Sequence, residues 1–238
     1  MRMEPHFHYE IKFLKPQHLP EILTLQNLVI ENLPDKECYY QEPLAFFEKV
    51  LADGKNCLGL FEAGDLIGFH MACLLEGNEA IGADIGLGGS EVSPIVQWGP
   101  TAIHPKYRQQ GLLKMLADHH LKIFRDRGYE HICLTIAPQN YASLSSAIRQ
   151  GFLIKRLTYK FGHLLRYVLH LDLKRPCKAP VCQVRVTGSD LESQQFLLSL
   201  GFYGSGVLRS QAETELLFGH DGFTGDSFRK SVVRRQCS

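Results

Sequence analysis

The chain has 238 residues, with 26 Lys and Arg against 25 Asp and Glu and 45% hydrophobic residues. This size and composition are typical of one large globular domain, or of a domain with a small appendage. The formal net charge of +1 provides no general attraction to nucleic acid or to anionic lipid, so we expect neither as a partner.

The seven cysteines are odd in number, are scattered along the chain and include no C-x-x-C pair. This pattern predicts free thiols in a reducing compartment and argues against a disulfide framework or a metal site. The first ten residues lack the apolar segment of a signal peptide, and no run of about 18 apolar residues occurs that would span a membrane. We therefore expect a soluble, cytoplasmic protein.

The first part of the chain predicts a strand, two helices and a hairpin. Residues 7–14 alternate apolar and polar side chains, as in a half-buried strand. Apolar residues recur at helical spacing over 19–33 and again over 44–51. Two apolar runs, 57–61 and 66–75, flank the turn-like sequence EAGD and predict a hairpin.

A glycine-rich excursion over 76–90 precedes the predicted central strand, 95–103. Gly99-Pro100 interrupts this strand and predicts a bulge or an edge, because proline has no N–H to donate to a sheet. Asp84 and Glu91 lie in or beside the excursion. They either face a bound amine or are simply exposed to solvent.

The segment after the central strand has features of an anion site. His104-Pro105 ends the strand, a polar loop follows, and a helix with an apolar stripe is predicted over 111–126. The free N–H groups of a loop that meets a helix N-terminus are aligned with the helix dipole. Arg108 at the mouth of the loop suits an anion, and Gly111 lets the backbone approach a ligand closely. An ordinary strand-to-helix connection is the alternative.

The next elements are a strand over 131–136, a helix that runs to Gln150 and closes at Gly151-Phe152, and a terminal strand over 159–173. His119 and His120 on the preceding helix have no ligand partner four residues further on. We therefore expect them to be structural.

Two of these segments together resemble the GNAT acyltransferase superfamily. The sequence PKYRQQGLL, residues 105–113, is similar to the family's acyl-CoA loop R/Q-x-x-G-x-G/A. Arg108 and Gly111 match, whereas Leu113 replaces the usual final Gly or Ala and would crowd a pyrophosphate unless it turns into the core.

The second segment resembles the family pattern N-x-x-[AS]-x-x-x-Y-x-x-x-G-F. Asn140, Ser143 and Gly151-Phe152 fall in register with it. The separation of the two segments, with a helix and a strand between them, is also that of the family.

The resemblance covers about residues 7–173 and implies an α/β (α+β) fold with a mixed, mostly antiparallel central sheet flanked by helices. It also implies a bulged central strand that parts from its neighbour, acetyl-CoA as the acyl donor, and no metal. Main-chain groups of Ala102 and Ile103 would pair with the pantetheine arm. The implied cofactor-binding residues are Ala102, Ile103, Arg108, Gln109, Gln110, Gly111, Leu112, Leu113, Lys114, Asn140 and Ser143.

The resemblance leaves the catalytic groups unassigned. The tyrosine that often protonates the leaving thiolate in the family is replaced by Ala147. Many relatives have a glutamate on the central strand, where this chain has Gln97 and Trp98, neither of which is a base. The side chains that remain as acceptors of a proton through water are Asp84, Glu91 and His104, and we weigh a structural role for the histidine above a catalytic one.

A basic, proline-containing linker over 174–180 predicts a division into a GNAT-like domain, 1–175, and a C-terminal appendage with its tail, 176–238. A strand over 182–186, the pair Asp190 and Ser193, and Gly201-Phe202 repeat the preceding pattern about fifty residues later, either as a partial repeat or by coincidence. We expect a strand-helix-strand appendage that packs on the main domain and is structural, a wall of the acceptor site or a dimer contact. The segment 207–218 could add two short strands, and 220–238 a loosely ordered end.

These features predict an N-acetyltransferase that transfers acetyl from acetyl-CoA to a primary amine by direct attack in a ternary complex. The acceptor is a small molecule or a peptide, its identity is not indicated, and a homodimer is one possible assembly. A catalytically weak acyl-CoA-binding module or sensor is the alternative, because Leu113, Ala147 and the missing strand glutamate all depart from the family pattern.

Overall fold

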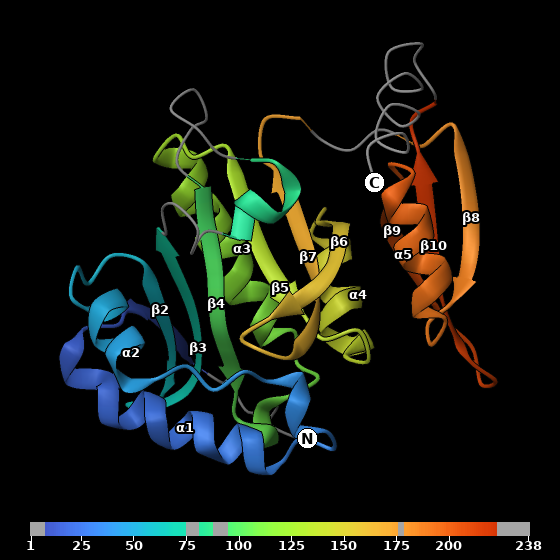
Figure 1. The fold of residues 1–238 in the computed structure, drawn as a ribbon. Coiled ribbons are helices and arrows are strands. Elements are labelled where there is room, and N and C mark those ends of the chain that lie inside the picture. Colours follow the sequence, from blue (N-terminus) through green and yellow to red (C-terminus); the bar gives the residue numbers. More distant parts are fainter. Residues whose placement is uncertain (1–7, 75–80, 88–94, 176–178, 223–238) are drawn as a thin grey trace, which may run out of the picture. The chain divides into compact units, whose positions relative to one another are not determined.

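The computed structural model describes residues 8–74, 81–87, 95–175 and 179–222 (Figure 1). By its internal contacts, the chain divides into two compact units. The first unit comprises Met1–Ala80 and Gly88–Leu134, and the second comprises Ile81–Leu87 and Thr135–Ser238. The expected boundary between residues 175 and 176 stays a prediction.

The first unit is a mostly antiparallel sheet with helices on both faces. Strands β1 to β4 are antiparallel neighbours in chain order, and β5 joins β4 in parallel. The elements are β1 (Tyr9–Phe13), α1 (Leu19–Glu31), α2 (Leu44–Leu51), β2 (Cys57–Glu62), β3 (Asp65–Leu74), β4 (Ile95–Ile103), α3 (Leu112–Asp126) and β5 (His131–Ile136), with short 3-10 helices η1 (Pro16–His18), η2 (Lys36–Cys38) and η5 (Pro105–Tyr107).

The helices cover the two faces of this sheet with two apolar layers (Figure 1). α1 and α2 pack Ile22 and Phe47 against Phe69 of β3 on one face. α3 packs Leu112 and Leu116 against β2 and β3 on the other. The predicted buried stripe of α3 is confirmed at Leu116, Ala117, His120, Leu121 and Phe124.

The bulge predicted from Gly99-Pro100 lies where the sequence places it. β3 and β4 pair Gly68 to His70 with Ile103 to Thr101, but Ala72 then pairs with Trp98, so β4 has one extra residue at this point. β4 and β5 pair only over Ile95–Gln97, although β4 continues to Ile103. The central strand therefore parts from its parallel neighbour where it bulges.

The second unit contains a pattern of strand and helix that occurs twice. Its sheet has the order β7-β6-β9-β10-β8, with antiparallel pairs throughout. Its elements are η4 (Ile81–Ile85), α4 (Tyr141–Arg149), β6 (Leu153–Lys160), β7 (Leu164–Asp172), β8 (Cys182–Thr187), α5 (Leu191–Ser199), β9 (Tyr203–Arg209) and β10 (Thr214–His220).

One expectation for this unit was wrong. The segment 159–173 is not one strand, because Phe161 and Gly162 take left-handed backbone conformations and turn the chain, which makes a hairpin of β6 and β7. The excursion over 76–90 contains the 3-10 helix η4 at its centre. Residues 220–238 were expected to form a loosely ordered end. The first of them, His220, is the last residue of β10, and residues 223–238 lie outside the described part of the chain.

The spacing repeat corresponds to a repeat of elements. α5, β9 and β10 begin fifty residues after α4, β6 and β7 respectively. Asn140 and Asp190 cap the two helices in the same way, each side chain accepting from the N–H three residues on, at 3.1 and 3.0 Å. β6 pairs with β9 through Ile154 and Gly204, so the second copy follows the first in reversed strand order. This correspondence favours a true repeat over coincidence, and β10 makes the appendage strand-helix-strand-strand.

A buried glutamine joins the two copies. Gln194 of α5 is fully buried, accepts a hydrogen bond from the phenol of Tyr167 on β7, and donates to the carbonyls of Thr187 and Gly188 at 2.9 and 3.1 Å. The ring of Tyr141 lies against Gly188, where a Cβ would be 2.5 Å from its hydroxyl. The appendage thus packs against the first copy, as expected from a sheet that cannot bury one face alone.

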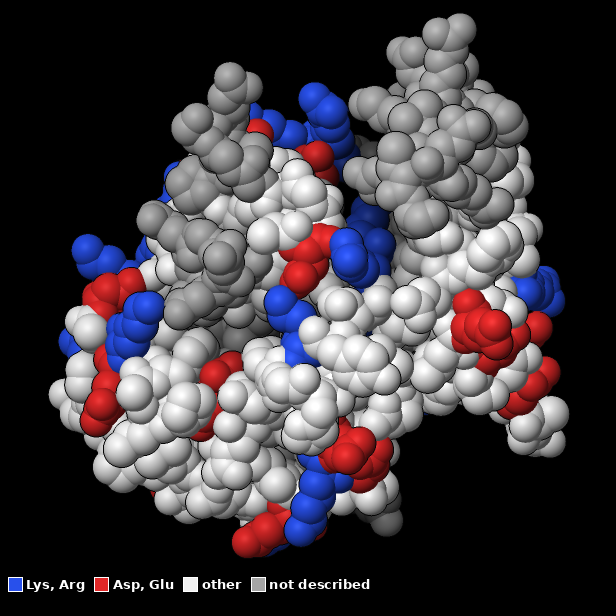
Figure 2. Space-filling model, viewed as in Figure 1, with Lys and Arg blue, Asp and Glu red and all other residues white. Residues whose placement is uncertain are grey.

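In the part of the chain that the structure describes, no helix is both long and apolar enough to cross a membrane. On the surface in Figure 2, basic and acidic side chains are interspersed among uncharged ones.

Candidate functional site

The loop that joins β4 to α3 has an unusual backbone. The N–H groups of Tyr107 and Arg108 donate to the carbonyls of His104 and Pro105, which closes η5. Gln109 and Gly111 then take left-handed conformations, with φ of 65° and 75°. Such a conformation is uncommon for glutamine and costs energy that the surrounding structure must offset.

Six successive N–H groups of this segment, 109–114, have no hydrogen-bond partner among the described residues. Gly111 is the N-cap of the 15-residue helix α3 and offers no side-chain cap. A Cβ placed on Gly111 would meet no atom within 4 Å, so the space beside this glycine is open. Free amides at the positive end of a helix dipole bind an anion.

The side chains of the loop leave this space accessible. Leu113, the departure from the family pattern, packs against the core layer of Leu112 and Leu116 and so turns away from the amides. Gln110 accepts a hydrogen bond of 2.9 Å from Tyr9. Arg108 is exposed and has no ion pair among the described residues. Its guanidinium is therefore available to a ligand, as phosphate recognition requires.

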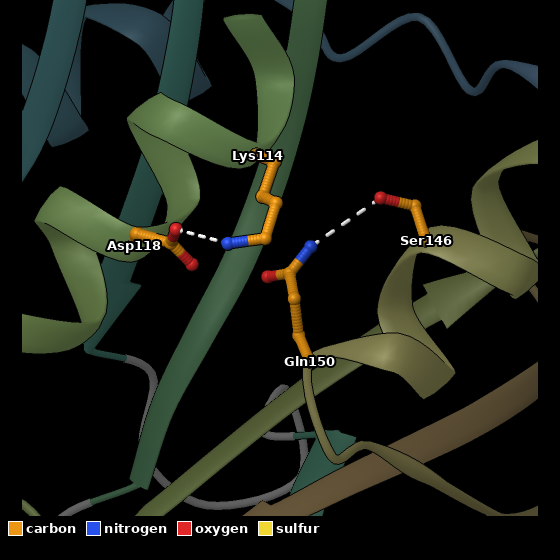
Figure 3. Close-up of polar contacts among 4 residues, drawn as sticks. All are labelled: Lys114, Asp118, Ser146 and Gln150. Carbon is orange, nitrogen blue, oxygen red and sulfur yellow. Dashed lines mark hydrogen bonds and ion pairs between the residues drawn. The ribbon is translucent and has the colours of Figure 1, made fainter. Parts of the chain in front are cut away.

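The Lys114 side chain contributes less to the anion site than its position suggests. Its ammonium lies 2.5 Å from the carboxylate of Asp118, one turn further along α3 (Figure 3). Both side chains are largely exposed, so this pair is weak and leaves the lysine able to exchange partners.

Ala102 and Ile103, the residues predicted to pair with the pantetheine arm, lie at the end of β4. Both are buried, and they pair with Phe69 and Gly68 of β3. They lie beyond Gln97, where the pairing of β4 with β5 ends. The main chain of this stretch is thus in the part of β4 that has left its parallel neighbour.

Asn140 and Ser143 lie in the second unit, on α4. The Asn140 side chain accepts from the N–H of Ser143 at 3.1 Å, which caps the helix. Asp190 and Ser193 do the same on α5 without any counterpart of the Arg108 loop. Helix capping alone therefore accounts for the N-x-x-S spacing. Further along α4, Gln150 donates to Ser146 at 3.4 Å (Figure 3).

Of the residues considered for proton transfer, those that the structure describes are occupied or apolar. Ala147 is buried on α4 and has only a methyl group. The carboxylate of Asp84 pairs with Lys160 at 2.7 Å. His104 accepts at Nδ1 from the N–H of Lys106, which gives it a capping role. Glu91 lies outside the described residues.

Sequence reasoning missed one carboxyl group with the properties of a base. Glu42, between η2 and α2, is half-buried, and burial raises its pKa to about 7. A pKa near the working pH is the property of an effective general base. The only indication in the sequence is an acid within the aromatic and proline-containing stretch YYQEP, residues 39–43.

His70 of β3 and His120 of α3 form a buried pair, with their Nδ1 atoms 2.8 Å apart and the ring of Trp98 4.4 Å from that of His70. Burial lowers the pKa of His70 to about 3, and burial with the neighbouring His70 lowers that of His120 to about 2. Both imidazoles are therefore neutral, and one donates to the other. Among the described residues, no group of three or more His, Cys, Asp or Glu side chains could hold a metal ion.

Comparison with known proteins gives a family and a fold. The family model described as the acetyltransferase (GNAT) family matches residues 21–152. Arabidopsis thaliana NAA60 in complex with acetyl-CoA superposes with a TM-score of 0.56 at 15% identity, covering 69% of this chain and 99% of that chain. YncA of Salmonella typhimurium, a putative acetyltransferase with its cofactor acetyl-CoA, superposes with a TM-score of 0.53 at 19% identity, covering 74% of this chain and 99% of that chain.

The NatC complex bound to Gag peptide and CoA gives a TM-score of 0.54 at 15% identity, covering 69% of this chain and 98% of that chain. Curated protein sequences gave no significant match. At these identities, the structural likeness concerns the fold: a mostly antiparallel open sheet flanked by helices.

Proposed function

Because the chain belongs to the GNAT acetyltransferase family, we propose that it is an N-acetyltransferase that transfers the acetyl group of acetyl-CoA to a primary amine by direct attack in a ternary complex. The observation that carries this proposal is the row of six free N–H groups at 109–114, beside a central strand that has left its parallel neighbour. Acetyl-CoA supplies a thioester at one end and a pyrophosphate at the other, and the loop fits the pyrophosphate.

The residues divide into two roles. The amides of Gln109, Gln110, Gly111, Leu112, Leu113 and Lys114, with the Arg108 side chain, would hold the phosphates. The main chain of Ala102 and Ile103 would follow the pantetheine arm, and Asn140 and Ser143 remain proposed contacts from α4. Holding donor and acceptor together is itself a large part of catalysis, because it replaces a bimolecular encounter.

The acceptor is proposed only as a class. NAA60 and Naa50 of Arabidopsis thaliana were solved with bisubstrate analogues, and the NatC complex with a peptide. These complexes support a peptide as the acceptor here, and a small-molecule amine is the other class that we propose.

The loop is tested with a double variant, Arg108→Ala with Gly111→Asp. The substitution removes a charged hydrogen-bond donor and puts a carboxylate where the anion would lie, so we expect acetyl-CoA to bind at least about 100-fold more weakly by calorimetry. Circular dichroism should show an unchanged fold, since both positions are exposed. The control is Lys106→Ala, an exposed cation of the same loop, which should bind nearly as well as wild type. Unchanged affinity in the folded double variant would refute the site.

The second candidate function is an acyl-CoA-binding module with little or no turnover, favoured by the methyl group of Ala147 and by Gln97 and Trp98 on the central strand. An assay of thiol release with a panel of primary amines separates the two. Tight acetyl-CoA binding with no release on any amine would favour the module.

A further inference from the structure

The segment between η2 and α2 brings a carboxylate to the central strands of the first unit. Phe46, four residues after Glu42, lies against the bulge of β4: its Cζ is 3.3 Å from where a Cβ of Gly99 would be. The first turn of α2, which follows Glu42 closely, therefore packs on the sheet where β4 bulges and parts from β5.

Cys73 locates the carboxylate more closely. Burial, followed by the charge of Glu42, raises the pKa of the Cys73 thiol to about 12. Cys73 belongs to the core layer shared with α2, pairs with Gln97 across the sheet and donates its thiol to the Gln97 carbonyl at 3.7 Å. Gln97 is the last residue at which β4 pairs with β5. Glu42 is thus within electrostatic reach of Cys73, whose partner Gln97 marks the point where the two strands separate.

The Glu42 carboxylate has no hydrogen bond or ion pair among the described residues, although it is half-buried. The charged and titratable groups around it are few. Tyr39 on the same segment donates its phenol to Gln26 at 3.2 Å, and Lys49 of α2 acts on Cys73 with the opposite sign to Glu42. Burying a carboxylate without a partner costs stability, and such groups concentrate at functional sites.

We propose that Glu42 is the general base of the acetyl transfer proposed above, on which this inference rests, and that it accepts a proton from the ammonium of the acceptor. The neutral amine nitrogen then attacks the carbonyl carbon of the acetyl group: the C–N bond forms and the C–S bond breaks. The second nitrogen proton goes to the departing sulfur, which leaves as the free thiol. The proton on Glu42 returns to water. This assignment provides the base that β4 lacks.

The matched variants are Glu42→Gln, which keeps the shape and removes the base, and Glu48→Gln on the exposed face of α2. With acetyl-CoA and the best acceptor of a panel of primary amines, Glu42→Gln should lower kcat/KM by roughly 100- to 10,000-fold, the usual contribution of a general base. Wild-type kcat/KM should rise with pH up to about 7, where Glu42 becomes charged, and this inflection should be absent from Glu42→Gln. With hydroxylamine, an acceptor that is uncharged at neutral pH, Glu42→Gln should lower kcat/KM much less.

Two readouts do not depend on turnover. The acetyl-CoA affinity of Glu42→Gln, by calorimetry, should equal that of wild type. In ¹³C NMR, one glutamate carboxyl should titrate near pH 7 and vanish in Glu42→Gln but persist in Glu48→Gln.

The outcomes separate the two proposals. If the wild type is active and kcat/KM of Glu42→Gln lies within threefold of the wild-type value, the role of Glu42 is overturned and the proposal of acetyl transfer stands. A wild type that binds acetyl-CoA but acetylates no amine would overturn both. A large loss in Glu42→Gln with an unchanged pH profile would mean that Glu42 positions the acceptor and is not the base.

Discussion

The contact between His70 and His120 ties the stability of the first unit to pH. Their pKa values of about 3 and about 2 lie below the ordinary 6.5, so the unfolded chain binds protons that the native protein does not. The groups that face the pair are Trp98, His119 and Arg127. Stability is therefore full above pH 6.5 and is lost as the pH falls from about 6.5 toward 3.

We expect His120→Leu to lower the free energy of unfolding by about 1–3 kcal/mol at pH 8, because the buried Nδ1 of His70 loses its partner. Urea denaturation measures this, with the exposed His119→Leu as the control. In a variant carrying both His70→Phe and His120→Leu, the midpoint should fall less between pH 7 and pH 5 than in wild type. An equal fall would show that other groups cause the acid sensitivity.

Glu42 changes the stability with pH in the direction opposite to that of the histidine pair. Its native pKa of about 7 lies above the ordinary 4.5, so the native protein holds a proton that the unfolded chain has released. Stability from this group falls as the pH rises from about 4.5 to about 7. Glu42→Gln should consequently melt no lower than wild type at pH 8, measured by thermal unfolding. A lower melting temperature would indicate a stabilising contact for the carboxylate.

Single residues differed in how far the sequence could predict them. Arg108 and Gly111 could be singled out because the features they offer are local: an exposed cation and a backbone turn at a helix start. Glu42 was not predicted, because its raised pKa comes from burial in the folded chain, which the local sequence does not reveal.

At the scale of elements, Gln194 is the polar centre of α5. Gln194→Ala would remove the acceptor of the Tyr167 phenol and the side-chain donor to the Gly188 carbonyl, and would leave the Thr187 carbonyl only the N–H of Asp190. We expect the free energy of unfolding to fall by about 1–3 kcal/mol in urea denaturation. The adjacent Gln195→Ala is the control, since that side chain is exposed, and it should have little effect. Equal effects of the two substitutions would mean that helix propensity, rather than the buried contacts, explains the loss.

Elements with a local cause were the most predictable. β4 was bounded correctly and its bulge was located, because proline restricts a strand wherever it occurs. The β6–β7 hairpin was missed because Phe161, in its turn, adopts a left-handed conformation that no sequence preference suggests.

At the scale of the whole molecule, the junction between the two copies depends on a glycine. A Cβ on Gly204 would lie 2.8 Å from that of Ile154, so β9 could not stay against β6. We expect Gly204→Ala to destabilise the second unit by about 1–3 kcal/mol, with amide exchange faster in β6 and β9. Ser205→Ala, one residue further along β9, is the control. Unchanged exchange in Gly204→Ala would show that the strands can move apart without loss.

The family and the α/β class were predictable from two local motifs and their separation. The reversed strand order of the second copy was not, because local patterns specify the elements of a sheet but not the neighbour each strand selects.

The fifty-residue offset between the copies also has a consequence for synthesis. The ribosome makes residues up to Leu134, and so all of the first unit, before any of β6 emerges. The edge of β6 must then wait for β9, about fifty residues later, which takes roughly 3 to 10 s at ordinary elongation rates. Throughout that interval a nascent chain presents an open strand edge, the kind of surface that pairs with other chains. Chaperone dependence and aggregation during expression should therefore be sensitive to codon usage between β6 and β9.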